Sequence, residues 1–206
     1  MNNTELYERL ATLIDESTAQ YFTDNERWAA LTDGQQEYTS IVLAQYKAKV
    51  LINPSEPIPE ILRALYVTVI STTGDSFIAL PQDFLYDISL VLGSPYSRPL
   101  LKRELSRTIP FDKANSYSGA SGYYYSITAS QILLEIPQPI NPGGLAYTLE
   151  YLKKPTKINS NIDPILPEYT HFAIVIFAFA QLLKKSARIQ EALYQYQEFV
   201  QSIKYL

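Results

Sequence analysis

The chain has 206 residues, 47% hydrophobic and 18% charged, so we expect it to fold around a core and not to stay disordered. It has no cysteine, which excludes disulfides and cysteine-based metal sites and fits assembly in a reducing cytoplasm. The net charge of −4 argues against a nucleic-acid binder that acts alone.

The negative charge is concentrated in residues 1–40, where eight acidic side chains and two arginines give a net charge of −6. One interpretation is a solvated helical face. The other is a negative surface that lies near DNA or contacts a basic partner. The sequence leaves both open.

Two helices are predicted at the N-terminus. The first is indicated by apolar residues on one helical face, and Asn2 followed by Glu5 is a plausible start. This face comprises Leu6, Leu10, Leu13 and Ile14. Thr23 and Glu26 form a capping-box pattern that predicts the start of a long second helix, which extends to about Leu51.

The second helix carries a predicted packed stripe, consisting of Leu31, Gly34, Tyr38, Ile41, Ala48 and Ile52. Gly34 is unfavourable inside a helix, so it indicates either a close contact between helices or a break. Three prolines in residues 53–59 then end the helical part.

The central segment has the β-branched and aromatic composition of strands. Strands are predicted at residues 65–70, 77–80, 87–92, 123–128, 132–136 and 145–152. Residues 73–76 are expected to turn the chain so that the second strand returns along the first. Residues 141–144 form a strong turn signal, and the last three strands are predicted to be antiparallel.

Two further helices are predicted at residues 168–184 and 187–204. The first contains the apolar run 172–180, which is too short to span a membrane and reads as a buried core helix. The second carries a stripe at helical spacing, made up of Ile189, Leu193, Tyr196, Val200 and Ile203.

The order of helices, strands and helices predicts an α+β fold, in which the terminal helices pack as a bundle and a central antiparallel β-region emerges from it. We expect a single domain over residues 1–206, with a helical part at 1–52 and 168–206 and a β-rich part at 60–155.

No set of residues with catalytic potential is evident. The single histidine, His171, lies at the start of the apolar helix and is expected to be a packed or capping residue. Metal-ligand spacings and phosphate-binding loops are absent from the sequence, although a carboxylate pair formed by folding is not excluded. A basic cluster, made up of Arg98, Lys102, Arg103 and Arg107, is interpreted as a solvated face. We therefore predict a structural protein with no catalytic residues, cofactor or metal.

The chain contains 17 tyrosines, an unusual number. Tyrosine is enriched at interfaces because its ring is apolar and its tip is polar, but packing within the fold is an equal alternative. The candidate contacts between subunits or between rings are Tyr117, Tyr123, Tyr124, Tyr125, Tyr194 and Tyr205.

Several segments, taken in order, resemble the head–tail adaptor (neck connector) proteins of tailed phages. Residues 21–35 resemble their second helix, and residues 77–85 resemble their aromatic-x-Leu-Pro-x-Asp-Phe segment. Residues 122–125 and 132–139 are similar to their tyrosine-rich strand and hydrophobic-Pro-x-Pro strand. Residues 149–155 and 166–169 match their last strand and the entry to the C-terminal helices. The resemblance spans nearly the whole chain.

The resemblance implies a structural subunit of a ring, typically of twelve copies, in the neck of the virion. Such a ring joins the portal protein to the tail or to a second neck-ring protein, and it continues the channel through which DNA passes during packaging and ejection. It implies no enzymatic activity, no cofactor, no membrane contact and no sequence-specific DNA binding. Assembly would take place in the host cytoplasm.

Two alternatives remain open. One is another structural virion protein, such as a tail-completion or baseplate subunit, which would differ in symmetry and partner. The other is a virion hydrolase or sugar-binding module, which would require a site whose substitution abolishes an activity without harming assembly.

Overall fold

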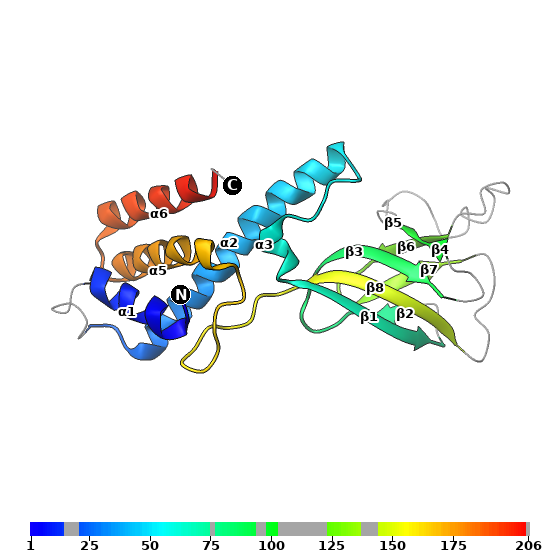
Figure 1. The fold of residues 1–206 in the computed structure, drawn as a ribbon, viewed down its shortest axis with the longest axis horizontal. Helices are drawn as coiled ribbons and strands as arrows, with labels where there is room; N and C mark the ends of the chain where they lie inside the picture. The colour runs from blue at the N-terminus through cyan, green and yellow to red at the C-terminus, as the bar shows by residue number, and fades with distance from the viewer. Residues whose placement is uncertain (15–20, 75–76, 94–97, 103–122, 137–143, 205–206) are drawn as a thin grey trace. The chain divides into compact units, whose positions relative to one another are not determined.

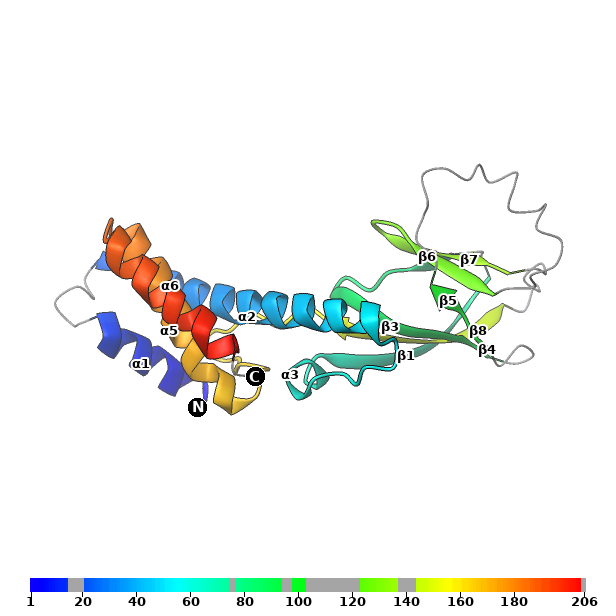
Figure 2. The ribbon, with the colours of Figure 1, turned by 90° about the horizontal axis from the view of Figure 1, so that it is seen from above.

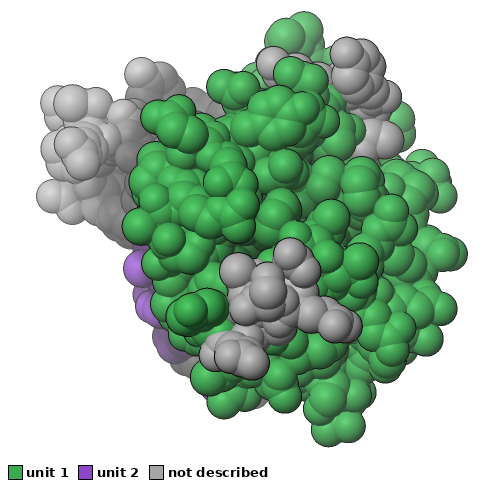
Figure 3. Space-filling model, turned by 90° about the vertical axis from the view of Figure 1, so that its left-hand side faces the viewer, with its two compact units in different colours: residues 1–65, 154–206 green, residues 66–153 purple. Residues whose placement is uncertain are grey.

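The computed structural model describes residues 1–14, 21–74, 77–93, 98–102, 123–136 and 144–204. They form two compact units (Figures 1 and 3). The helical unit comprises residues 1–65 and 154–206, and the β unit comprises residues 66–153. Helices at both ends of the chain and antiparallel sheets between them confirm the predicted α+β class.

The helical unit consists of α1 (Asn3–Ile14), α2 (Asp24–Ile52), α3 (Glu60–Arg63), the 3₁₀ turn η2 (Glu168–Thr170), α5 (His171–Lys185) and α6 (Ile189–Lys204). Local signals set the start of the first two helices. Asn2 and Glu5 exchange backbone-to-side-chain hydrogen bonds of 2.9 Å each, and Thr23 and Glu26 form the predicted capping box. Of the described helices, none combines the length and apolarity needed to cross a membrane.

Helix α5 is the centre of this unit and contacts α1, α2 and α6. Most of its apolar run is buried, as predicted, whereas Phe172 at the start of the run is 45% exposed. Helix α2 approaches α5 closely at Gly34, where a Cβ atom would lie 2.7 Å from the backbone oxygen of Ile174. Gly34 therefore marks a tight helix contact and not a break.

Three residues of the predicted stripes were placed wrongly. Ala48 and Ile52 are exposed, because the buried face of α2 runs only as far as Tyr46. Leu13 of α1 is partly exposed, because Leu6, Leu10 and Ile14 already form the buried face of that helix.

Two buried polar residues of α2 bind the segment that follows the β unit in the chain. Thr32 exchanges hydrogen bonds with the backbone of Ile158, its hydroxyl donating to the oxygen at 3.2 Å and accepting from the amide at 3.1 Å. The Gln35 amide donates to the Thr156 oxygen at 2.8 Å and accepts from the Ile165 amide at 2.9 Å. These bonds satisfy backbone groups in a segment that has little regular structure of its own.

The described residues of the β unit form two four-stranded sheets (Figures 1 and 2). In order across the first sheet, the strands are β1 (Tyr66–Thr73), β8 (Leu145–Lys153), β3 (Phe84–Leu92) and β4 (Arg98–Pro99). In order across the second, they are β2 (Phe77–Ala79), β7 (Gln131–Glu135), β6 (Tyr124–Ile127) and β5 (Leu101–Lys102). Every pairing is antiparallel except the short one between β5 and β6.

The sheets share one core cluster, and their pairing corrects two expectations. The core includes Ile78 and Ile132 from the second sheet and Leu90, Leu92 and Leu149 from the first. Strand β2 does not return along β1, and β8 does not continue the β6–β7 hairpin. In both cases the chain changes sheet, so that strands adjacent in sequence cover opposite sides of one core.

Candidate functional site

The six tyrosines predicted as contacts have different environments. Tyr194, on α6, is 60% exposed, and Tyr123 and Tyr124 are half-buried at the start of β6. Tyr125 is 3% exposed and belongs to the core of the β unit. The other two, Tyr117 and Tyr205, lie outside the described residues. Among these candidates, Tyr194 has the largest described exposed surface, and a contact role for the set stays a prediction.

Tyr125 is held by a polar cluster between the two sheets. Its hydroxyl donates a 2.7 Å hydrogen bond to Asp87, a buried carboxylate on β3. Lys102 of β5 binds the other carboxylate oxygen at 2.6 Å, and its ammonium lies over the ring of Tyr86. Burial, reinforced by the Asp87 charge, raises the pKa of Tyr125 well above its usual range. The cluster therefore joins the sheets.

The predicted solvated basic cluster is thus only partly correct. Arg98 is exposed, with its guanidinium 5.8 Å from the centre of the Tyr123 ring. Lys102 instead pairs with a buried acid, because its side chain reaches from β5 in one sheet to Asp87 on β3 in the other. Arg103 and Arg107 lie outside the described residues.

Helix α6 has apolar side chains on two adjacent faces. One face packs inward through Ala192, Phe199 and Ile203, and the Phe199 ring lies 5.0 Å from that of Phe177 on α5. The predicted stripe is divided between the core and the surface. Ile203 is buried and Val200 is half-buried, whereas Phe199, which the stripe does not include, occupies a central position in the core. The three stripe members with exposed surface are called the α6 stripe, namely Ile189, Leu193 and Tyr196.

The α6 stripe follows helical spacing, since its members are four and three residues apart. Leu193 is 52% exposed and Ile189 is 47% exposed. Tyr196 is 39% exposed, because its ring lies 6.1 Å from that of Phe177 and 6.0 Å from that of Phe199. Apolar side chains in a continuous row on a surface are typical of a site that contacts another protein. Tyr194 follows Leu193 and points to another side of the helix, so it extends the exposed apolar surface of α6.

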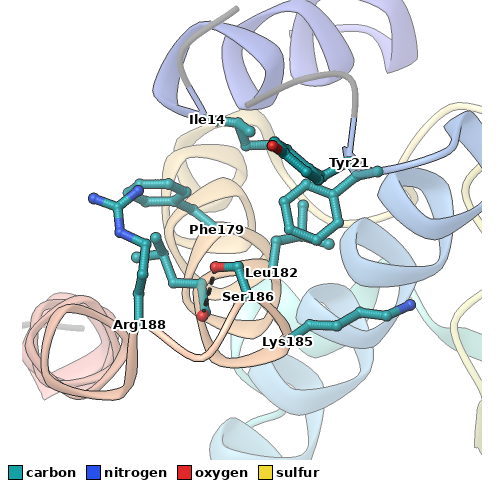
Figure 4. Close-up of a pocket in the computed structure, with 9 residues that line it drawn as sticks. Ile14, Tyr21, Phe179, Leu182, Lys185, Ser186 and Arg188 are labelled. Atoms are coloured by element: carbon teal, nitrogen blue, oxygen red, sulfur yellow. Dashed lines mark hydrogen bonds between the residues drawn. The ribbon is translucent and has the colours of Figure 1, made fainter. Parts of the chain in front are cut away.

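A cavity of about 470 Å³ lies beside the turn between α5 and α6 (Figure 4). Its walls are mainly apolar, with contributions from Ile14, Tyr21, Phe22, Phe179, Leu182 and Leu183. The two cations at its border are engaged, Lys185 with Glu26 and Arg188 with Glu191. The Ser186 hydroxyl donates to the backbone oxygen of Leu183 at 2.9 Å. The cavity thus offers apolar surface and no general base or activated nucleophile.

His171 is the first residue of α5 and is buried, with Nε2 2.8 Å from the backbone oxygen of Leu166. Burial lowers its pKa, which favours the neutral ring. The ring packs at the junction of η2 and α5, in agreement with the structural role expected of it. Over the described parts of the chain, no group of three or more histidine, aspartate or glutamate side chains is arranged to hold a metal ion.

The acidic N-terminal segment is partly neutralised within the helical unit. Glu26 pairs with Lys185, which together with the capping box lowers the pKa of Glu26 to about 2. Tyr7 donates a hydrogen bond to Asp24 and accepts one from Arg27. Glu8 and Asp33 remain exposed to solvent. The segment thus combines internal pairs with free surface acids.

Comparison with known proteins identifies the chain. No curated protein matches it. The family model described as SU10 adaptor protein matches residues 1–206, the whole sequence. This family is a phage head–tail adaptor family, which agrees with the resemblance of the ordered segments. The chain therefore belongs to the SU10 adaptor protein family and is a structural adaptor of a bacteriophage.

Proposed function

We propose that this adaptor is a subunit of the ring in the phage neck, where it joins the portal to the tail or a second neck protein. The ring is closed, typically from twelve copies, and it continues the channel through which DNA passes without sequence-specific contacts. Membership of the adaptor family supports this role over the whole chain.

The observation that carries the proposal is the α6 stripe. A closed ring requires a heterologous interface, in which two different patches of each copy meet those of its neighbours. The α6 stripe supplies one apolar patch on a helix whose adjacent face is fixed in the core by Phe199. Tyr194 widens it. Burial of such side chains between copies would contribute about 25 cal/mol per Å² of apolar surface before the costs of association.

The charge distribution supports a channel that does not hold DNA. The net charge is −4, and Glu8 and Asp33 are exposed within the acidic first 40 residues. Tight DNA binding requires clustered cations that neutralise phosphates, and affinity grows with each contact. A weakly acidic ring repels phosphate and lets the duplex slide.

The proposal is tested by the oligomeric state of the full-length chain with and without portal rings of the same phage. Native mass measurement and electron microscopy should show a closed ring bound to the portal. A chain that stays monomeric and does not bind portal would overturn the proposal, and binding to the tail tube alone would favour a tail-completion subunit.

Substitutions in α6 test whether the α6 stripe forms the contact between copies. Leu193→Asp combined with Ile189→Asp places charges in the α6 stripe and should abolish ring formation while circular dichroism stays unchanged. The matched control is Gln190→Asp with Gln197→Asp, two exposed positions of the same helix outside the stripe. It should form rings as the wild type does.

A further inference from the structure

The edges of the two sheets in the β unit differ in how well they are protected. An edge strand exposes a row of backbone N–H and C=O groups, and soluble proteins protect such edges by shortness, proline or charge. Strand β4 has two residues, an arginine and a proline, and β5 has two, one of which is Lys102. Strand β2 has three. These three edges are protected.

Strand β1 is the fourth edge and has none of these protections. It runs for eight residues, Tyr66–Thr73, without a charge or a proline. Its register with β8 is unbroken from the Tyr66–Leu152 pair to the Thr73–Leu145 pair, whereas the β3–β8 pairing has two irregularities. Among the described strands only β8 pairs with it, and Figures 1 and 2 show it at the border of its sheet. Among the described strands, β1 is therefore a long and regular edge with a partner on one side.

The side chains of β1 are divided between the core and solvent. Val67 and Val69 pack against the core of the β unit, which holds the strand in place. Thr68, Ile70 and Thr72 alternate with them and are exposed, and Ile70 is 78% exposed. Val67 and Val69 thus anchor the strand to the core, while the side chains of its other face are exposed.

We propose that β1 is an assembly edge that receives an extended strand from a neighbouring copy of this chain, and this inference rests on the proposed ring. A row of open backbone groups is complementary to another extended backbone, which adds to the sheet as one more strand. The incoming side chains that flank Ile70 are uncharged or apolar, because β1 offers no charge to pair with them.

The neighbouring copy is the partner that leaves no edge exposed. In a closed ring every subunit covers the β1 edge of the next, so all edges are removed at once, as closure removes them in a barrel. A free edge of this length would otherwise favour aggregation. Its lack of charge and proline fits a strand that assembly covers.

The first test is hydrogen exchange of the β1 amides in the free chain and in the ring assembled on portal. Alternate amides between Thr68 and Thr72 face away from β8 and should exchange quickly in the free chain. Pairing should slow them by about tenfold or more in the ring. Unchanged exchange in assembled rings would overturn the inference and leave the proposed ring intact.

The second test introduces positive charges on β1. Thr68→Lys with Ile70→Lys alters two exposed side chains and should leave the fold unchanged by circular dichroism. The yield of rings on portal should fall by about tenfold or more, since lysines on an edge oppose strand pairing. The matched control, Gln36→Lys with Ser40→Lys, adds the same charge on the exposed face of α2.

The outcomes separate the two proposals. If the wild-type chain forms rings and the β1 variant forms them equally well, the assembly edge is wrong. If the variant forms rings but no longer binds the tail, the edge takes a strand from another neck protein and the inference is again wrong. A wild-type chain that forms no ring on portal overturns the proposed function, and the inference with it.

Discussion

The helical unit and the β unit obtain their structure from interactions of different range. Helices α1 and α2 start at side chains that bond backbone groups three residues away, as Asn2 does with Glu5 and Thr23 with Glu26. The central strand β8 instead pairs with β1 and β3, and Tyr66 lies opposite Leu152. Local rules therefore set most helix boundaries, whereas strand partners depend on distant residues.

The two units also use polar groups differently. The helical unit is mainly an apolar contact around α5, with close approach at Gly34. The β unit holds its sheets together with a buried carboxylate that contacts both Tyr125 and Lys102. The stability of the helical unit should therefore be most sensitive to added side-chain volume, and that of the β unit to the loss of a hydrogen bond.

The largest effect is expected for Gly34→Ala. Alanine favours a helix by about 1 kcal/mol, but its methyl group would lie 2.7 Å from the Ile174 oxygen, so overpacking should dominate and lower the stability by about 2 kcal/mol. Denaturant unfolding followed by fluorescence of Trp28, the single tryptophan and part of α2, measures the loss. Gly74→Ala is the control, because nothing lies within 4 Å of its added atom. Equal effects at both positions would contradict the tight contact.

Much of the helical unit could be predicted from sequence because its signals are short in range. The capping box at Thr23 and the apolar run of α5 follow from propensity and spacing. Gly34 left a close helix contact and a break as alternatives, and the approach of Ile174 decided between them. The buried face of α6 could not be predicted, because Phe199 and the Ile189–Leu193 row are both apolar and tertiary packing chose between them. Gln35 was also missed, since its partners Thr156 and Ile165 are 121 and 130 residues away.

The β unit was predictable strand by strand but not in its pairing. Composition and turns identify strands, yet they do not say whether a turn joins partners or carries the chain to the opposite sheet. Asp87 and Lys102 illustrate the limit for the candidate site. An acid inside an apolar strand indicates a buried partner, but the sequence does not name it, and Lys102 was interpreted as a solvated residue.

The second prediction concerns Tyr125→Phe in the β unit. The change keeps the ring but removes the 2.7 Å hydrogen bond to buried Asp87, so stability should fall by about 1.5 kcal/mol. Hydrogen exchange of the β6 and β7 amides, resolved by nuclear magnetic resonance, measures the loss within this unit. Tyr194→Phe, on the exposed surface of α6, should change stability by less than about 0.5 kcal/mol. A neutral Tyr125→Phe variant would show that Lys102 alone satisfies the carboxylate.

The third prediction is a pH dependence confined to the helical unit. Burial lowers the pKa of His171 from 6.5, so below that pH the unfolded chain binds a proton that the folded chain does not. Stability should therefore fall as the pH decreases below 6.5. Glu26, with its pKa lowered to about 2 from 4.5, contributes stability that is lost only below pH 4.5.

The window between pH 6.5 and 4.5 thus isolates the histidine. Unfolding monitored by Trp28 fluorescence across this window should show the decrease in the wild type. His171→Gln retains a donor for the Leu166 oxygen and lacks a titrating ring, so its stability should vary less over the same range. Parallel curves for the two proteins would contradict a buried neutral His171.

The smallest expected effect is a gain in stability at the turn between α5 and α6. Ala187 has a φ of +63°, a left-handed conformation that costs alanine about 1 kcal/mol relative to glycine. Its amide and that of Arg188 bond the last carbonyls of α5, at Lys184 and Leu183, so the conformation is fixed by the helix end. Ala187→Gly should therefore raise the stability by about 0.5–1 kcal/mol.

The control is Ala48→Gly, at an exposed position inside α2, which should lower the stability by about 1 kcal/mol. Thermal unfolding of the two variants measures both signs, and a loss at both positions would contradict a conformational cost at Ala187.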